Sequence, residues 1–206
     1  MDGNVLILGI TGNIASGKST VSKELARRGA VIVDADQLAR EVVEAGSSAL
    51  KKIVDVFGAE VLKNDGHLDR DKLGQMVFAD VKVRAMLNRI VHPEIAKKSI
   101  ERLQELKQRE GVSLIVYEAP LLFEVGAEAR VDKVLVVKID PVEQLKRLQV
   151  RDGLSEAAAK ERMAAQMPQQ QKISRADYVI DNSGSVEETI HQVDSLWPRL
   201  TVTAPV

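Results

Sequence analysis

Short apolar runs rich in β-branched residues alternate with helical patterns along much of the chain. Runs of this kind, bounded by turn residues, are typical of strands buried on both faces of a parallel sheet. They predict strands at residues 5–10, 31–33, 113–117, 133–137 and 178–180. Together with the helical patterns between them, these strands predict an α/β fold.

The first strand opens a strand–helix–strand unit. A helix is predicted over residues 18–28, with Val21 and Leu25 one turn apart on its inner face and Gly29 at its end. The second strand follows within about 30 residues of the first, and the crossover of such a unit is right-handed in nearly all cases.

Residues 37–109 show helical patterns separated by turns and no convincing strand. Within them, Asp69 is a candidate N-cap. His92-Pro93 predicts a junction between two helices, because proline suits the first turn of a new helix. We therefore expect a helical insertion between the second and third strands.

The C-terminal part predicts three more helices. One spans residues 141–151, a second begins after the candidate N-cap Ser155, and the last runs from about 186 to 196. The chain from Pro198 onward is expected to lack regular structure.

Composition limits the class of protein. The chain has 206 residues, enough for one well-cored domain, and 45% are hydrophobic and 29% charged. No apolar run reaches the length of about 18 needed to cross a bilayer, and residues 1–4 lack the basic start of a signal peptide. We expect a cytoplasmic protein without membrane insertion.

Cysteine is absent, which excludes disulfides, thiolate zinc sites and cysteine nucleophiles. The net charge of −1 gives no electrostatic footprint for nucleic acid. We expect a monomer or a weak homo-oligomer that binds no nucleic acid.

The stretch Gly12-Asn13-Ile14-Ala15-Ser16-Gly17-Lys18-Ser19-Thr20 has the full spacing of a phosphate-binding loop, or P-loop, between a predicted strand and a predicted helix. The glycines let backbone N–H groups surround phosphate oxygens, and the helix directs its positive end at the same anion. Lys18 would lie along the β- and γ-phosphates, Ser19 would ligate Mg²⁺, and Thr20 would support the α-phosphate. The motif predicts ATP and Mg²⁺ as ligands.

Two carboxylates follow the second strand, at the sheet edge where ligands gather in α/β proteins. Asp36 is the candidate base for a phosphoryl acceptor, because it is expected in the first turn of a helix beside the phosphate site. Asp34 has two interpretations, a part in that chemistry or the N-cap of the same helix.

Other candidates lie later in the chain. Arg147 is favoured as a group that stabilises the phosphoryl group during transfer. For Arg151, this role and a place on a solvated helix face are both open. Lys160 and Arg162 better suit a solvated helix face. The loop Pro120-Leu121-Leu122-Phe123-Glu124 predicts a substrate wall, although Leu121 or Leu122 also suits the core. For His92, a structural hydrogen bond is the alternative to a functional role.

Taken together, these motifs resemble the dephospho-coenzyme A kinase family, whose members phosphorylate the ribose 3′-hydroxyl of dephospho-CoA. The resemblance covers nearly the whole chain. It rests on Gly9 to Thr20, Val33-Asp34-Ala35-Asp36, Ala39 to Val43, Phe57-Gly58, Asp65-Gly66-x-Leu68-Asp69-Arg70, His92-Pro93-x-Ile95, Pro120 to Glu124, Gln144-Leu145-x-Arg147-Leu148 and Ala176-Asp177-x-Val179-Ile180-Asp181-Asn182-x-Gly184.

The resemblance implies a P-loop NTPase fold, a three-layer α/β/α core with a five-stranded parallel sheet. The core would comprise about 1–36 and 112–206, with a helical CoA-binding insertion at about 37–111 and a lid within about 147–172. It implies Asp36 as base and Lys18 and Arg147 as phosphoryl-stabilising groups. Positions implied for the acceptor site are Arg40, His92 and Pro120 to Glu124, and those implied near adenine are Asn182 and Gly184.

The loop departs from the family pattern at Asn13 and Ala15, which replace glycines common there. Asn tolerates left-handed dihedrals and alanine is small, so phosphate binding should survive, with strain if Ala15 has a positive φ. Two other functions remain as alternatives, a P-loop kinase for another small acceptor such as a nucleoside monophosphate and a nucleotide-dependent switch. The Asn-Lys-x-Asp element of guanine-selective switches is absent.

Overall fold

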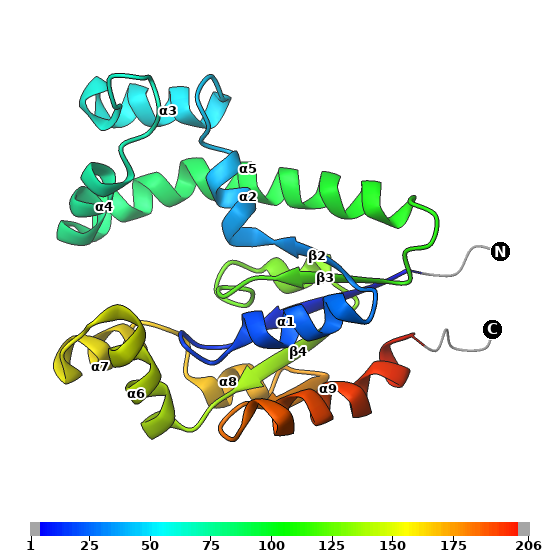
Figure 1. The fold of residues 1–206 in the computed structure, drawn as a ribbon. Coiled ribbons are helices and arrows are strands. Elements are labelled where there is room, and N and C mark those ends of the chain that lie inside the picture. The colour runs from blue at the N-terminus through cyan, green and yellow to red at the C-terminus, as the bar shows by residue number, and fades with distance from the viewer. Residues whose placement is uncertain (1–4, 202–206) are drawn as a thin grey trace. The chain divides into compact units, whose positions relative to one another are not determined.

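The computed structural model describes residues 5–201, apart from the side chains of Phe78 and Ala79. The chain divides into two compact units (Figure 1). The first unit combines Met1–Val33 with Leu103–Val206, and the second is Asp34–Arg102. Among the described residues, no helix is both long and apolar enough to cross a bilayer.

The sheet has five parallel strands in the order β2-β3-β1-β4-β5. Their bounds are β1 Leu6–Thr11, β2 Val31–Asp34, β3 Leu114–Glu118, β4 Lys133–Lys138 and β5 Tyr178–Asp181. Each predicted strand is therefore confirmed to within about a residue at either end. Strand β1 lies between β3 and β4, so the loop that follows β1 leaves from the middle of the sheet.

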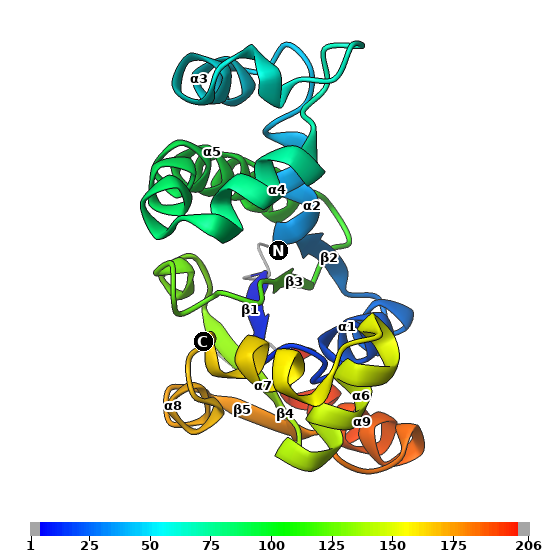
Figure 2. The ribbon, with the colours of Figure 1, turned by 90° about the vertical axis from the view of Figure 1, so that its left-hand side faces the viewer.

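Helices cover both faces of the strands in the first unit. The helices that lie wholly in this unit are α1 Lys18–Arg27, α6 Pro141–Asp152, α7 Glu156–Ala164, α8 Gln169–Ile173 and α9 Val186–Thr201, with the short 3₁₀ helix η2 at Ala127–Arg130. Figure 2 shows α1 and α9 on one side of the strands and α8 on the other. The predicted inner residues Val21 and Leu25 are fully buried against the sheet, and the N-cap role of Ser155 at α7 is confirmed.

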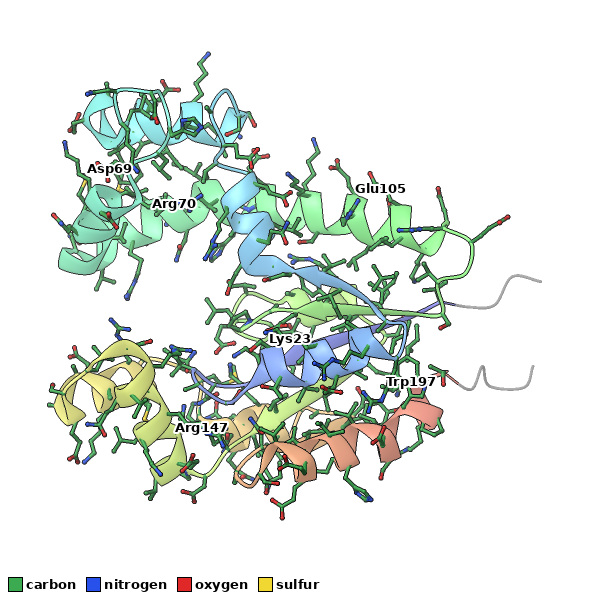
Figure 3. All side chains as sticks on the ribbon, viewed as in Figure 1. Lys23, Asp69, Arg70, Glu105, Arg147 and Trp197 are labelled. Carbon is green, nitrogen blue, oxygen red and sulfur yellow. The ribbon has the colours of Figure 1, made fainter. Side chains whose placement is uncertain are left out.

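The second unit is helical. It contains α2 Ala35–Glu41, α3 Ser48–Phe57, the 3₁₀ helix η1 at Ala59–Val61, α4 Arg70–Ala79 and most of α5 Val81–Lys107. Its core is formed mainly by Leu50, Ile53, Phe57 and Val61. Asp69 caps α4 by accepting from the Lys72 N–H at 3.0 Å, as predicted, and Figure 3 shows Asp69 and Arg70 at the start of that helix.

Two predictions at prolines are wrong. Pro93 lies inside α5, and no helix junction occurs at His92-Pro93. Val91 and Ile95 pack against the same core cluster on both sides of the proline, and this burial outweighs the loss of one backbone hydrogen bond.

Likewise, α9 continues through Pro198 to Thr201 instead of ending near Leu196. Leu196 and Leu200 are both buried in the sheet-side core, so packing continues across the proline. Residues 202–206 of the predicted tail, and residues 1–4 at the other end, lie outside the described part of the chain.

Candidate functional site: the phosphate loop and its surroundings

The loop between β1 and α1 has the backbone of a tightly wound turn. A Cβ at Gly12 would collide with the Val137 carbonyl oxygen, and a Cβ at Gly17 would collide with the Asn182 amide. Gly17 has φ 87° and is the N-cap residue of α1. Both glycines are therefore required by close contacts within the protein.

The start of α1 suits an anion. Its N-cap residue has no side chain to accept from the first-turn N–H groups, and that turn carries no acidic residue. Lys18 directs its Nζ back to the loop, 3.0 Å from the Gly12 carbonyl oxygen and 3.3 Å from that of Asn13. The exposed Ser19 follows it. Backbone dipoles and one ammonium thus converge on the loop, an arrangement that attracts phosphate.

A second feature of the loop also suits a polar ligand. Among the described residues, the Oγ of Ser16 and the Oδ1 of Asn13 are buried and have no hydrogen-bond partner. An unsatisfied buried polar atom costs about 1–3 kcal/mol. A phosphate oxygen that accepted from the Ser16 hydroxyl would remove part of this cost.

Ala15 is the one described residue other than glycine with a positive φ, 59°. The left-handed region costs an L-residue with a Cβ roughly 1–2 kcal/mol. The strain anticipated for an alanine at this position is therefore present in the loop.

Replacing Ala15 by glycine should relieve that strain. We expect Ala15→Gly to raise the free energy of unfolding by about 0.5–1 kcal/mol, measured by urea denaturation, because the gain exceeds the entropic cost of glycine. The control is Ala26→Gly on the exposed side of α1, where the same change should lower stability by about 0.5–1 kcal/mol. A loss of stability at both positions would contradict the strain at Ala15.

Asn182 lies directly against the loop. Its Nδ2 donates to the Ser16 carbonyl at 2.7 Å, and its Oδ1 accepts from the Thr189 hydroxyl at 2.6 Å. The residue is 4% exposed. Both ends of the amide therefore have partners within the protein, while the predicted approach to adenine stays a prediction.

Gly184 lines a cavity of about 450 Å³ at the end of β5, together with Asp181, Ser183, Glu188, His191 and Gln192. Burial by itself raises the pKa of Asp181, but hydrogen bonds from Lys138 and Ser183 outweigh it and lower the pKa. Asp181 is therefore ionised at neutral pH, and its carboxylate is paired with the Lys138 ammonium at 2.8 Å.

The loop after β3 is held from inside the protein. Leu122 is fully buried, whereas Leu121 is 45% exposed, so Leu122 is the core residue of the pair. The Pro120 carbonyl accepts from the Thr11 hydroxyl at 3.1 Å and from Lys172 Nζ at 3.0 Å. Glu124 forms an ion pair with the same lysine at 2.8 Å, and the Lys172 side chain has no exposed surface.

The candidate basic residues of α6 and α7 form ion pairs with nearby acids. Arg147 Nε is 2.9 Å from Glu143 Oε1, one turn earlier on α6. Asp152 accepts from both Arg151 and Arg162, and its hydrogen bond with Arg151 lowers the pKa of the Asp152 carboxyl. Figure 3 shows Arg147 on α6.

Three predicted site residues belong to the second unit. Asp36 and Arg40 are exposed on α2, and His92 is half-buried on α5. The Asp34 carboxylate accepts from the N–H groups of Asp36 and Gln37, so the N-cap interpretation of Asp34 is the one that the structure supports. Asp34 is therefore the last residue of β2, and its side chain caps the first turn of α2.

Sequence reasoning assigned no role to Lys172, Gln144 or Gln166, which touch the site from α8, from α6 and from the segment after α7. Gln144 belongs to one of the motifs quoted for the resemblance. No sequence signal distinguishes the buried Lys172 from the exposed lysines of the chain, because only the packing of α8 on the sheet buries it.

Comparison with known proteins identifies the family. A model of the family described as dephospho-CoA kinase matches residues 6–188. The dephospho-CoA kinase of Geobacter sulfurreducens is 50% identical over 193 residues, which cover 94% of this chain and 98% of that protein. The dephospho-CoA kinase of Bacillus cereus is 47% identical and covers 92% of this chain and 94% of its own.

Comparison with solved structures supports the same family. The dephospho-CoA kinase of Campylobacter jejuni is 31% identical, covers 95% of this chain and 96% of its own, and superimposes with a TM-score of 0.74. The shikimate kinase of Bacteroides thetaiotaomicron, 14% identical with a TM-score of 0.52, covers 94% of this chain and 98% of its own and shares the fold alone. By sequence and by structure, this chain belongs to the dephospho-CoA kinase family.

Proposed function

We propose that this protein transfers the γ-phosphoryl group of ATP to the ribose 3′-hydroxyl of dephospho-CoA, with coenzyme A and ADP as products. Family membership carries the proposal, because relatives named dephospho-CoA kinase match it over nearly their full length at about half of all positions. The phosphate loop, with its lysine and unpartnered Ser16 hydroxyl, supports the ATP half of the reaction.

The chemistry is an in-line displacement. The bond from the γ-phosphorus to the ADP oxygen breaks as a bond to the 3′-oxygen forms, and the hydroxyl proton passes to the Asp36 carboxylate. Lys18 and Arg147 stabilise the charge on the transferring group; Arg147 would exchange its Glu143 partner for phosphate oxygens.

The Ser19 hydroxyl would hold Mg²⁺ together with the phosphates. The part of the chain that the structure describes offers no cluster of three or more histidine or acidic side chains for a metal ion. This fits Mg²⁺, which is commonly bound through one or two protein groups plus substrate phosphates. Bound there, the ion would neutralise charge on the β- and γ-phosphates.

The remaining contacts follow the family pattern. We assign Gly12 to Thr20 to the triphosphate, and Asn182 and Gly184 to the adenine side. Arg40, His92 and the loop of Pro120, Leu121, Leu122 and Glu124 are assigned to the acceptor. We also propose a cytoplasmic location, which suits a chain without cysteine.

The test is an acceptor screen. Purified protein is incubated with MgATP and, separately, dephospho-CoA, AMP, adenosine or shikimate, and products are identified by mass spectrometry. We expect one added phosphoryl group, on the 3′-oxygen of dephospho-CoA, and its loss in Lys18→Ala. Phosphorylation of another acceptor in its place would favour the other kinase function, and ATP hydrolysis independent of any acceptor would favour a switch.

A further inference from the structure

The tip of the phosphate loop is held by two glutamine side chains. The N–H of Ile14 donates to Gln166 Oε1 at 2.7 Å, and the carbonyl of Ile14 accepts from Gln144 Nε2 at 2.8 Å. Gln144 is a residue of α6 and is 4% exposed, whereas Gln166 follows α7. Both polar groups of one backbone residue are thus satisfied from two separate elements.

These contacts flank the strained residue of the loop. Ile14 precedes Ala15, with its φ of 59°, and Ser16 after it is held through its carbonyl by Asn182 at 2.7 Å. A residue in a sparsely populated conformation persists only where the surrounding structure fixes it. Side-chain amides on both neighbours of Ala15 provide that restraint.

We propose that Gln144 and Gln166 are positioning residues for ATP. They contact no phosphate; they orient the backbone of Ile14 so that the N–H groups from Ala15 onward face the triphosphate. The N–H and C=O of Ile14 are both hydrogen-bonded to the two glutamines, so the loop keeps its wound shape before the nucleotide binds. This reduces the conformational entropy that the loop loses on binding ATP. The inference rests on the proposed binding of ATP by this loop.

The two glutamines use opposite ends of their amides, and this permits a matched test. Gln166 serves as an acceptor, a role that glutamate retains. Gln144 serves as a donor, a role that an ionised glutamate loses. Gln144→Glu and Gln166→Glu add the same charge near the loop, so the difference between them reports the hydrogen bond.

We expect Gln144→Met and Gln166→Met each to raise the Kd for MgATP, measured by calorimetry without acceptor, by about fivefold to tenfold, the effect of one lost hydrogen bond. The KM for dephospho-CoA should change less than about twofold, because binding of that substrate is assigned to other residues. Gln144→Glu should weaken ATP binding more than Gln166→Glu. Gln170→Met, on an exposed residue of α8, is the control and should leave the Kd unchanged.

Unchanged Kd values in both folded methionine variants would overturn the inference, as would an equal rise in the KM for dephospho-CoA. Folding is checked by near-UV circular dichroism and the unfolding midpoint. Calorimetry of ATP binding separates this inference from the proposed function. If the wild-type protein binds ATP but does not phosphorylate dephospho-CoA, the proposed function is refuted. The effect of the two glutamines on the Kd for ATP can still be measured in that case.

Discussion

Asp36→Asn is expected to lower kcat for dephospho-CoA phosphorylation by about 10²–10⁴-fold, the usual contribution of a general base. Asparagine keeps the size and polarity of the side chain but cannot take the proton of the 3′-hydroxyl. The Kd for MgATP should stay within about twofold of wild type, because phosphate binding is assigned to other residues. Steady-state kinetics and calorimetry measure the two quantities.

The matched control is Asp34→Asn, two residues earlier. Asp34 accepts from the N–H groups of Asp36 and Gln37, and asparagine caps helices as well as aspartate does. This variant should retain most of its turnover. Turnover near wild type in Asp36→Asn, or an equal loss in both variants, would remove Asp36 from the role of base.

Among the substitutions proposed here, Lys172→Met is expected to lower the free energy of unfolding the most, by about 3 kcal/mol. The Lys172 side chain is completely buried, and its ammonium is 2.8 Å from Glu124 and 3.0 Å from the Pro120 carbonyl. Removing one partner of a buried ion pair leaves the other charge without compensation, which typically costs about 3–5 kcal/mol. Glu124 is 21% exposed, so water offsets part of that cost. Urea denaturation measures the change.

The same substitution at Lys160 is the control, because Lys160 pairs with Glu156 on the surface of α7 with both side chains 62% exposed. Exposed pairs contribute about 0–1 kcal/mol, so Lys160→Met should change stability by less than about 0.5 kcal/mol. In a double-mutant cycle, Lys172→Met with Glu124→Gln should cost less than the sum of the single changes. Additive losses would show that the two groups do not interact.

The Lys172 pair also has a functional consequence. It joins α8 to the loop of Pro120 to Glu124, and Thr11 at the end of β1 holds the same Pro120 carbonyl. The loop assigned to the acceptor is therefore supported by buried polar groups. A side chain assigned to substrate on sequence grounds, Glu124, has its carboxylate engaged within the protein in this structure.

The strands and the phosphate loop were predictable because their signals are local. Buried strands such as Leu114–Glu118 are apolar on both faces, and Gly12 and Gly17 are needed wherever backbone must pass close to other atoms. The N-caps Asp69 and Ser155 were predictable for the same reason, since a cap bonds to residues three positions away.

Prolines misled the prediction of helix ends. Pro93 and Pro198 each interrupt the hydrogen-bond ladder, and local rules therefore place a boundary there. In the structure the apolar residues on both sides of each proline pack against a core: Val91 and Ile95, which are partly buried, in one case, and the buried Leu196 and Leu200 in the other. Tertiary packing decided the length of both helices.

The amino-acid sequence by itself determined the α/β class, the phosphate loop and the family, because each depends on residue types at fixed short spacings. Only the tertiary structure decided which polar side chains support that loop and the loop after β3. Gln144, Gln166 and Asn182 lie more than 100 residues from the backbone groups that they hold. Lys172 lies 48 residues from Glu124 and 52 residues from Pro120. Such partners are brought together by the packing of helices on the sheet, and hydrogen bonds between them leave no periodic pattern in the sequence.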